Sequence, residues 1–281
     1  MKRIAIIPNE TKDKGLEITR RAAELLSGRA EVLMAEGVEA PPTAVRLVPY
    51  EELFEAADCM VVLGGDGTML QIAAPCARRN IPVLGINLGR IGFLTEVETD
   101  GLEDAFEKLL AGDFETESRM LMKAEIIRDG CVTAWDHALN DVVAAKNTGA
   151  KLIDIELYAG GELVNKYIAD GLIIATPTGS TGYSISAGGP VADPHMELYI
   201  ATPICAHMLS VRSAVLPPES EIVMRLDENY LNNGAVVSAD GDVLGSIAPG
   251  DEVRITRSDY RLSIIKIGCR SFYDTVLKKL S

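Results

Sequence analysis

Paired cysteines are missing from this chain. Its five cysteines are spread singly along 281 residues, with no CxxC spacing, so neither a disulfide framework nor a zinc site is indicated. Scattered thiols instead fit a protein of the reducing cytoplasm. Histidine is also scarce, and the three histidines (His137, His195 and His207) have no metal-ligand spacing. We therefore interpret each histidine as a structural residue.

Positive charge and long apolar runs are also lacking. Lysine and arginine number 27 against 41 acidic residues, which gives a net charge of −14. Such a surface repels nucleic acid and anionic membranes, and no cluster of basic residues offsets it. No apolar run approaches membrane-spanning length, and the first one is cut by Pro8, too early for a signal peptide. We expect a cytoplasmic protein without nucleic-acid or membrane partners.

The composition that is present is that of a folded protein, with 47% hydrophobic and 24% charged residues. A chain of this length can bury two cores. Up to about residue 110, apolar runs of strand length alternate with helical patterns, which predicts a doubly wound parallel sheet. The expected strands are 3–7, 31–34, 59–63 and 81–87, and the expected helices are 16–26, 51–57, 68–79 and 102–110. The order of the strands is not determined by these patterns.

The character of the chain changes near Gly112. From residue 120 to about 267, strand patterns alternate with turn residues, and Asp129-Gly130 suits a hairpin turn. A β-rich second domain is therefore predicted, with strands that include 251–255 and 262–267. The last segment, 271–280, is an amphipathic helix too short to be stable alone, and we expect Phe272, Val276, Leu277 and Leu280 to bury it against the first domain. The predicted domains are 1–112 with 271–281, and 113–270.

The stretch Gly64-Gly65-Asp66-Gly67-Thr68 directly follows the expected strand 59–63. Strands of α/β proteins place ligands at this end, and glycines let the backbone turn N–H groups toward an anion. A carboxylate in such a turn repels phosphate, unless a metal intervenes or Asp66 takes a proton from a hydroxyl beside the phosphate. A plain strand-to-helix turn with Asp66 as the helix cap is the simpler interpretation.

A second stretch, 170–190, is a strand that runs into a loop of glycine and small hydroxyl residues. Such loops offer N–H and hydroxyl donors to phosphates and ribose, although a surface loop is the simpler interpretation. The spacing at Gly179-Ser180-Thr181-Gly182 is one residue short of a nucleophile elbow, and no Gly-Lys dipeptide of a Walker loop occurs. A third feature, Asn140-Asp141, can form a turn or hydrogen-bond an adenine edge or ribose hydroxyls.

Taken together, these stretches resemble the NAD kinase family. Residues 64–68 match its GGDGT motif, Asn140-Asp141 its Asn-Glu/Asp pair, 170–190 its long glycine-rich signature, and 202–210 a fourth segment. The likeness runs from about residue 58 to 245, with the motifs in family order. GGDGT alone is shared with relatives among lipid kinases and phosphofructokinases, whereas the long signature is specific.

The resemblance implies an enzyme that uses ATP and a divalent metal (Mg²⁺ or Mn²⁺) to phosphorylate the 2′-hydroxyl of the adenosine ribose of NAD. Asp66 would be the general base, Phe93 would lie against the adenine, and the protein would be a homodimer or homotetramer whose subunits share NAD sites. By position, the residues implied in nucleotide binding are Gly65, Gly67, Thr68, Phe93, Asn140, Asp141, Lys151, Asp170, Thr181, Gly182, Tyr183, Ser184, Ile185, Ser186 and Asp242.

Three positions depart from the family pattern and concern nucleotide preference and affinity. Gly182 stands where alanine is usual, Ile168 where a basic residue is common, and Asp242 where glutamine is common. Two other functions are considered. A lipid kinase with the same turn would expose an apolar surface, which this acidic chain does not suggest. A dinucleotide-binding sensor without turnover would gain nothing from an unpaired carboxylate facing phosphates.

Overall fold

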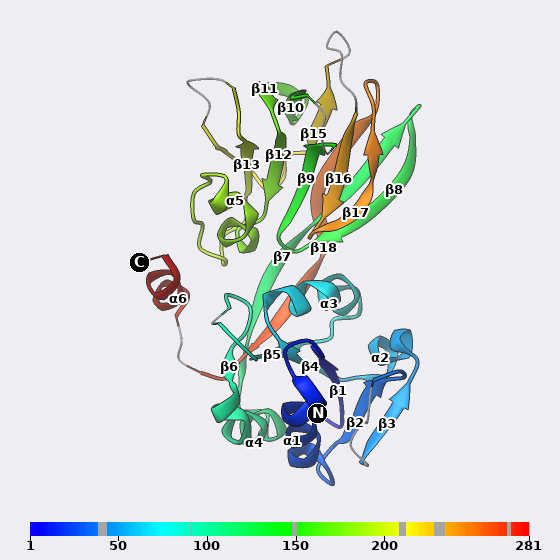
Figure 1. Ribbon diagram of the computed structural model, residues 1–281, viewed down its shortest axis with the longest axis vertical. Coiled ribbons are helices and arrows are strands. Elements are labelled where there is room, and N and C mark those ends of the chain that lie inside the picture. The colour runs from blue at the N-terminus through cyan, green and yellow to red at the C-terminus, as the bar shows by residue number, and fades with distance from the viewer. Residues whose placement is uncertain are drawn as a thin grey trace. The chain divides into compact units, whose positions relative to one another are not determined.

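A computed structural model describes residues 1–38, 44–90, 92–147, 151–207, 212–227, 234–268 and 271–280. The chain forms two compact units (Figure 1): unit 1 is Met1–Arg119 with Tyr260–Ser281, and unit 2 is Met120–Asp259. The sequence analysis set these boundaries at 112 and 271. The structure sets them inside two long strands, β7 (Glu115–Arg128) and β18 (Glu252–Lys266), where no change in composition marks them.

Unit 1 contains a parallel sheet with the strand order β3–β2–β1–β4–β5. Its strands are β1 (Arg3–Pro8), β2 (Glu31–Ala35), β3 (Val45–Val48), β4 (Cys59–Gly64) and β5 (Val83–Asn87). This is the order of a doubly wound sheet, whose first strand lies in the middle. The short β6 (Val97–Glu98) and the end of β18 both pair with β5. The sequence did not predict β3 or β6, because each is too short to show a pattern.

Helices contact each other in two pairs, which is how both faces of the unit 1 sheet are covered. The first pair is α1 (Glu17–Leu26) with α4 (Leu102–Ala111), and the second is α2 (Tyr50–Ala56) with α3 (Asp66–Arg79). Leu26 of α1 and Phe106 of α4 share one buried cluster with Ile4 and Leu63 of the sheet. The predicted doubly wound architecture is thereby confirmed.

The terminal helix α6 (Phe272–Leu280) belongs to unit 1, as predicted. Its Phe272 ring lies 5.9 Å from the ring of Phe93. Leu277, however, is 67% exposed, so the expectation that this side chain is buried is wrong, and the side chain of Leu280 lies outside the described residues. The helix therefore contacts unit 1 through residues of its first and last turns, Phe272 and Lys279, and not along a continuous apolar stripe.

Unit 2 consists of two antiparallel sheets. The first has the order β11–β10–β15–β18, and β7 pairs with β18 and with β8. The second has the order β14–β13–β12–β9–β16–β17. The bounds are β8 (Cys131–Ala138), β9 (Asp141–Lys146), β10 (Ile153–Ala159), β11 (Glu162–Ala169), β12 (Gly171–Ala175), β13 (Tyr199–Ile204), β14 (Ala214–Leu216), β15 (Ile222–Leu226), β16 (Ala235–Ala239) and β17 (Asp242–Ile247).

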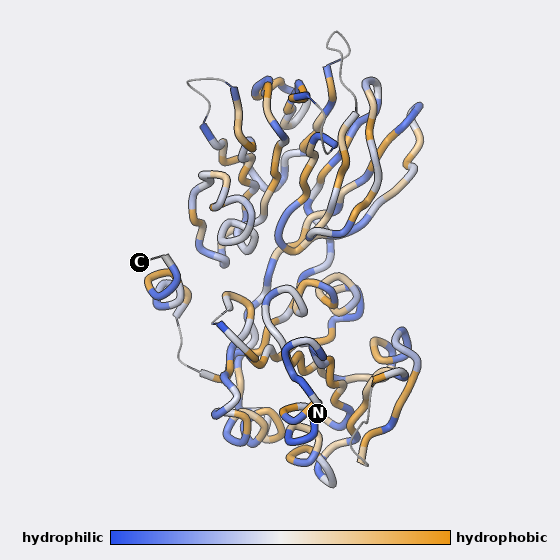
Figure 2. Tube along the Cα trace, viewed as in Figure 1, coloured by the Kyte–Doolittle hydropathy of each residue, from blue (hydrophilic) through white to orange (hydrophobic). Residues whose placement is uncertain are grey.

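The core of unit 2 lies where the two sheets share their buried side chains. Ile155 and Met224 of the first sheet belong to one cluster with Val142, Ile174 and Val237 of the second. Burial alternates along β16, where Ala235, Val237 and Ala239 are buried and the residues between them are half-buried. Hydrophobic stretches lie in the strands of both units (Figure 2). The expected strands 251–255 and 262–267 are parts of a single strand, β18. Two strands were expected because the exposed polar middle of β18 interrupts the apolar pattern. None of the described helices is long and apolar enough to cross a membrane.

Candidate active site

The turn between β4 and α3, residues 64–68, places a carboxylate at the ligand-binding edge of the unit 1 sheet. Gly65 is extended (φ −152°, ψ −170°), and α3 begins at Asp66 without a side-chain cap. Asp66 Oδ2 instead accepts a 2.9 Å hydrogen bond from the N–H of Phe93, and its Oδ1 accepts a 3.0 Å bond from the N–H of Leu94. The interpretation of Asp66 as a helix cap is therefore wrong.

A close approach of the backbone at Gly92 keeps the Asp66 side chain in this position. A Cβ atom on Gly92 would lie only 2.1 Å from Asp66 Oδ1, so no larger residue fits there without moving the carboxylate. The Asp66 side chain remains 30% exposed. The carboxylate is thus fixed by two N–H groups and is still open to solvent and ligands.

Two residues that follow β1 meet the same turn, although they lie more than fifty positions earlier in the chain. Asn9 Nδ2 donates a 2.8 Å hydrogen bond to Thr68 Oγ1. The Lys12 ammonium lies so close to Gly65 that a Cβ there would be 2.6 Å from Nζ. A lysine ammonium beside the positive end of a fourteen-residue helix suits an anion such as phosphate. The only feature of the sequence that could have indicated Asn9 and Lys12 is that both follow a buried parallel strand.

A second lysine, from α6, also lies beside Asp66. Lys279 Nζ is 4.0 Å from Asp66 Oδ2 and 4.4 Å from the centroid of the Phe93 ring. The ring of Phe93 is therefore contacted by Phe272 and Lys279, at the position where the resemblance implies the adenine of NAD. No motif in the sequence points to Lys279.

In unit 2, the Asn140 turn, which we define as residues 139–141 between β8 and β9, meets the glycine-rich loop. The N–H of Thr176 donates a 2.8 Å hydrogen bond to the carbonyl of Asn140. A Cβ on Gly179 would lie 2.0 Å from the same carbonyl oxygen, so this contact requires glycine. A Cβ on Gly182 would lie 3.5 Å from Asn140 Nδ2 and 3.8 Å from Asp141 Oδ2. The structure thus brings together the second and third sequence motifs.

Asp240 also belongs to this cluster. Its carboxylate accepts hydrogen bonds from the N–H groups of Leu139, Asn140 and Asp141, at 2.7, 2.8 and 3.1 Å. Burial, together with the negative charge of Asp240, raises the pKa of Asp141 to about 7. Burial raises the pKa of Asp240 to about 6, although its three N–H partners act in the opposite direction. The sequence analysis selected Asp242 and missed Asp240, two residues earlier.

Comparison with known proteins identifies the family. Residues 4–114 match the ATP-NAD kinase N-terminal domain, and residues 139–267 match the ATP-NAD kinase C-terminal domain. The NAD kinase of Natranaerobius thermophilus is 37% identical over 283 residues, which cover 100% of this chain and 98% of that protein. The chain belongs to the NAD kinase family.

Other members of the NAD kinase family align over the same length. The NAD kinase of Heliobacterium modesticaldum is 40% identical, over 100% of this chain and 99% of that protein. The crystal structure of an NAD kinase from Archaeoglobus fulgidus in complex with ATP has a TM-score of 0.75 at 30% identity, over 99% and 98% of the two chains. The crystal structure of yeast NADH kinase complexed with NADH has a TM-score of 0.90 at 23% identity, over 100% of this chain and 87% of that chain. This similarity shows a shared fold.

Several residues implied by the NAD kinase motifs lie away from the Asn140 turn. Asp170 precedes β12, whose residue Ala175 pairs with Asp141 and whose Gly171 pairs with Ala145. Asp170 is therefore at the opposite end of β9, roughly 16 Å along the strand, where its Oδ1 lies 2.6 Å from Lys146 Nζ. Lys151 and Asp242 are both exposed, and no contact of either with the Asn140 turn is seen.

The short helix α5 (Tyr183–Ser186) follows the glycine-rich loop and carries four of the implied residues. Tyr183 is 47% exposed and can meet a ligand, as can the exposed Ser186 and the half-buried Ile185. Ser184 is fully buried, and its Oγ lies 2.9 Å from Thr202 Oγ1. Thr181 Oγ1 donates to the carbonyl of Thr178. Ser184 therefore helps to hold the fold of the loop.

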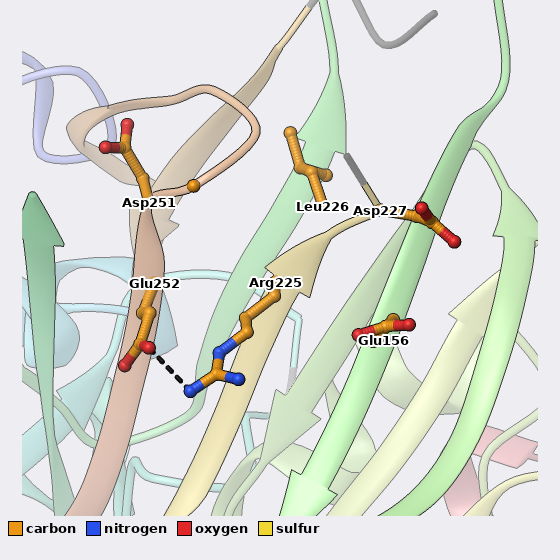
Figure 3. Close-up of a pocket in the computed structure, with 7 residues that line it drawn as sticks. Glu156, Arg225, Leu226, Asp227, Asp251 and Glu252 are labelled. Carbon is orange, nitrogen blue, oxygen red and sulfur yellow. Dashed lines mark ion pairs between the residues drawn. The ribbon is translucent and has the colours of Figure 1, made fainter. Parts of the chain in front are cut away.

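A hollow of about 350 Å³ in unit 2 lies away from these motifs (Figure 3). Its walls include the carboxylates of Glu156, Asp227, Asp251 and Glu252, and Arg225 forms an ion pair with Glu252. None of the residues that line this hollow belongs to the NAD kinase motifs, so we do not assign the nucleotide site to it. Among the residues that the structure describes, no group of three or more His, Cys, Asp or Glu side chains could hold a metal ion.

Proposed function

We propose that this chain transfers the γ-phosphoryl group of ATP to the 2′-hydroxyl of the adenosine ribose of NAD, which gives NADP and ADP. Membership of the NAD kinase family supports the reaction. The observation that carries the proposal is the geometry of Asp66. Two backbone N–H groups fix its carboxylate beside the start of α3, while nearly a third of the side chain stays exposed. A carboxylate used only as a helix cap would accept its hydrogen bonds from N–H groups of its own helix, whereas the donors to Asp66 belong to Phe93 and Leu94.

In this proposal Asp66 is the general base. Asp66 accepts the proton of the 2′-hydroxyl as the ribose oxygen attacks the γ-phosphorus. The bond from the γ-phosphorus to the bridging oxygen breaks, ADP leaves, and the proton passes from Asp66 to solvent. Lys12 and the N-terminus of α3 offset the negative charge of the phosphates. Lys12 is assigned this role because its ammonium lies against Gly65.

The divalent metal, Mg²⁺ or Mn²⁺, would arrive with ATP as part of the substrate. The described residues do not form a metal site of their own, and the steps assigned to Asp66 and Lys12 do not depend on one. The metal would offset phosphate charge when MgATP is bound.

We assign the adenosine of NAD to the cluster of the Asn140 turn and the glycine-rich loop. The amide of Asn140 and the carboxylate of Asp141 lie beside Gly182, where the missing Cβ leaves room. Asp170 lies at the far end of β9 and would serve an NAD bound by a neighbouring subunit, which supports a homodimer or homotetramer. Exposed apolar residues such as Trp135 of β8 and Val243 of β17 offer a surface for such assembly. We place the protein in the cytoplasm, in keeping with its scattered thiols.

The experiment is an assay of the purified chain with MgATP and NAD, in which NADP is measured enzymatically and ADP by chromatography. The proposal predicts equal amounts of NADP and ADP. Parallel reactions contain sphingosine or diacylglycerol in place of NAD. Phosphorylation of a lipid without NADP would favour a lipid kinase, and binding of NAD without either product would favour a sensor. Light scattering after gel filtration tests the oligomer, which a monomer mass would refute.

A further inference from the structure

A single carboxylate binds every N–H group of the Asn140 turn. Asp240 Oδ2 accepts from Leu139, and Asp240 Oδ1 accepts from both Asn140 and Asp141, all within 3.1 Å. The N–H of Asp240 in turn donates a 2.9 Å hydrogen bond to the carbonyl of Asp141. Four hydrogen bonds therefore join the hairpin of β16 and β17 to the turn between β8 and β9.

Asp240 does more here than form its own hairpin. Asp240-Gly241 has left-handed backbone at both positions (φ 48° and 94°), and the hairpin of β7 and β8 has the same arrangement at Asp129-Gly130 (φ 50° and 75°). Asp129 is exposed and its carboxylate makes no such set of backbone bonds. The conformation of an Asp-Gly hairpin thus does not require the three bonds of Asp240, which serve the Asn140 turn instead.

The Asn140 turn is left with polar groups that a ligand can use. Asn140 Oδ1 is buried and has no hydrogen-bond partner among the residues that the structure describes. Asp141 is only 7% exposed, and a Cβ on Gly182 would lie 3.8 Å from its Oδ2. A buried polar atom without a hydrogen-bond partner lowers the stability of the fold, and a ligand that supplies the partner removes this cost.

We propose that Asp240 is a positioning residue for NAD, which holds the Asn140 turn so that Asn140 and Asp141 present their side chains to the adenosine. Asp240 does not touch the nucleotide and acts only through the three backbone N–H groups. The inference rests on the proposed function, because it takes NAD as the ligand of the Asn140 turn.

Proton binding follows from the same geometry. Asp141 and Asp240 are two buried carboxylates in one cluster, and their pKa values are raised to about 7 and about 6. The titratable groups of the adjoining strands nearest to this cluster in the chain are Asp136 and His137 of β8 and Asp242 of β17; Cys131 of β8 and Lys146 of β9 lie at the far ends of their strands. Residues 176–182 contribute none. As pH falls from about 7 to below 6, Asp240 loses the charge that favours three N–H donors, and Asp141 loses the charge that accepts ribose hydroxyls. NAD binding must therefore weaken toward low pH.

The test compares Asp240→Asn with Asp129→Asn, which removes the same charge from the matched, exposed hairpin. Steady-state kinetics from pH 5.5 to 8.5 give kcat and the KM for NAD and for ATP, and calorimetry gives the Kd for NAD. In Asp240→Asn the amide nitrogen faces the N–H of Leu139, so we expect the KM for NAD to rise about 10- to 100-fold at pH 7.5. The KM for ATP should change by less than about twofold, because ATP binding does not depend on the Asn140 turn.

The pH profile separates positioning from a general loss of structure. In the wild type the Kd for NAD should rise as pH falls below about 7. In Asp240→Asn this rise should move to lower pH, because Asp141 no longer faces a second negative charge. Asp129→Asn should keep the wild-type profile. A wild-type Kd that is flat from pH 5.5 to 8.5, or an Asp240→Asn variant whose NAD and ATP constants change alike, would overturn the proposal.

Amide hydrogen exchange tests the inference even if the wild type makes no NADP. The N–H groups of residues 139–141 should exchange at least about tenfold faster in Asp240→Asn than in the wild type. Asp129→Asn should leave their exchange unchanged. Equal protection in all three proteins would show that Asp240 does not hold the turn, whereas an absence of NADP formation alone would refute the proposed function.

Discussion

The backbone N–H of Phe93 donates a 2.9 Å hydrogen bond to Asp66 Oδ2. The two residues follow neighbouring parallel strands, Asp66 after β4 and Phe93 after β5. The bond therefore ties two loops at the ligand-binding edge of the sheet to one carboxylate. Its consequence is that the position of Asp66 depends on a loop outside the GGDGT motif.

Gly92→Ala tests this dependence. The new Cβ would lie 2.1 Å from Asp66 Oδ1, so the carboxylate must move, and a displaced general base should lower kcat by roughly tenfold or more. Steady-state kinetics with NAD and MgATP give the measurement. Gly89→Ala is the matched control, since its Cβ would meet nothing within 4 Å. An unchanged kcat in Gly92→Ala would mean that the placement of Asp66 is not needed.

Lys12→Ala should raise the KM for ATP. The ammonium lies against Gly65 at the start of α3, and the loss of a charged hydrogen-bond donor to phosphate should weaken ATP binding about tenfold or more. The KM for NAD should change little. Lys14→Ala removes an exposed charge two residues away and serves as the control. If both variants shift the KM for ATP equally, Lys12 acts only through net charge.

Asn140→Ala and Asp141→Ala should each weaken NAD binding without a comparable effect on ATP. Both side chains are placed to hydrogen-bond the adenosine, and unpaired groups left in such a site cost about 1–3 kcal/mol. Calorimetry with NAD measures the change directly. Two variants with wild-type affinity would reduce Asn140-Asp141 to a structural turn.

Lys279→Ala should raise the KM for ATP modestly. Lys279 Nζ lies 4.0 Å from Asp66 Oδ2, and without it the negative charge of Asp66 repels the phosphates more strongly. Because both side chains are about one-third exposed, solvent weakens the effect to about 2- to 5-fold. Lys278→Ala is the neighbouring control.

Removal of residues 271–281 should cause the same change in the KM for ATP and lower the melting temperature by only a few degrees, since Leu277 is exposed.

A truncated protein that unfolds far below the wild-type temperature would contradict this account of α6. It would mean that the helix supports unit 1 through more than the contacts of Phe272 and Lys279. A truncated protein with the wild-type KM for ATP would instead show that Lys279 does not affect the phosphates.

The sequence predicted what depends on local patterns. Apolar runs located the central strands of unit 1, and the glycines around Asp66 marked the turn at the end of β4. Contacts between distant segments left no such signal. Lys12 lies against Gly65, and Gly92 and Lys279 lie against Asp66, although all three come from other parts of the chain. No local sequence pattern indicates these contacts.

The same limit explains what the sequence did not indicate in unit 2. The sequence did not indicate a role for Asp240, because an Asp-Gly pair is typical of an ordinary hairpin turn. Its three N–H partners lie about a hundred residues earlier in the chain. The single strand β18 was divided in two because residues 259–261 are polar and exposed. Asp170 belongs to the same motif as Gly182, yet the antiparallel pairing of β9 with β12 separates it from Asp141.

The most direct test of the central claim compares NADP formation by the wild type and by Asp66→Asn. Both proteins are given saturating NAD and MgATP, and calorimetry with NAD is run in parallel. Asparagine retains the shape of the side chain but cannot accept the proton, so kcat should fall roughly 10²- to 10⁴-fold while the Kd for NAD stays within about twofold. An Asp66→Asn variant that makes NADP at nearly the wild-type rate would contradict the account.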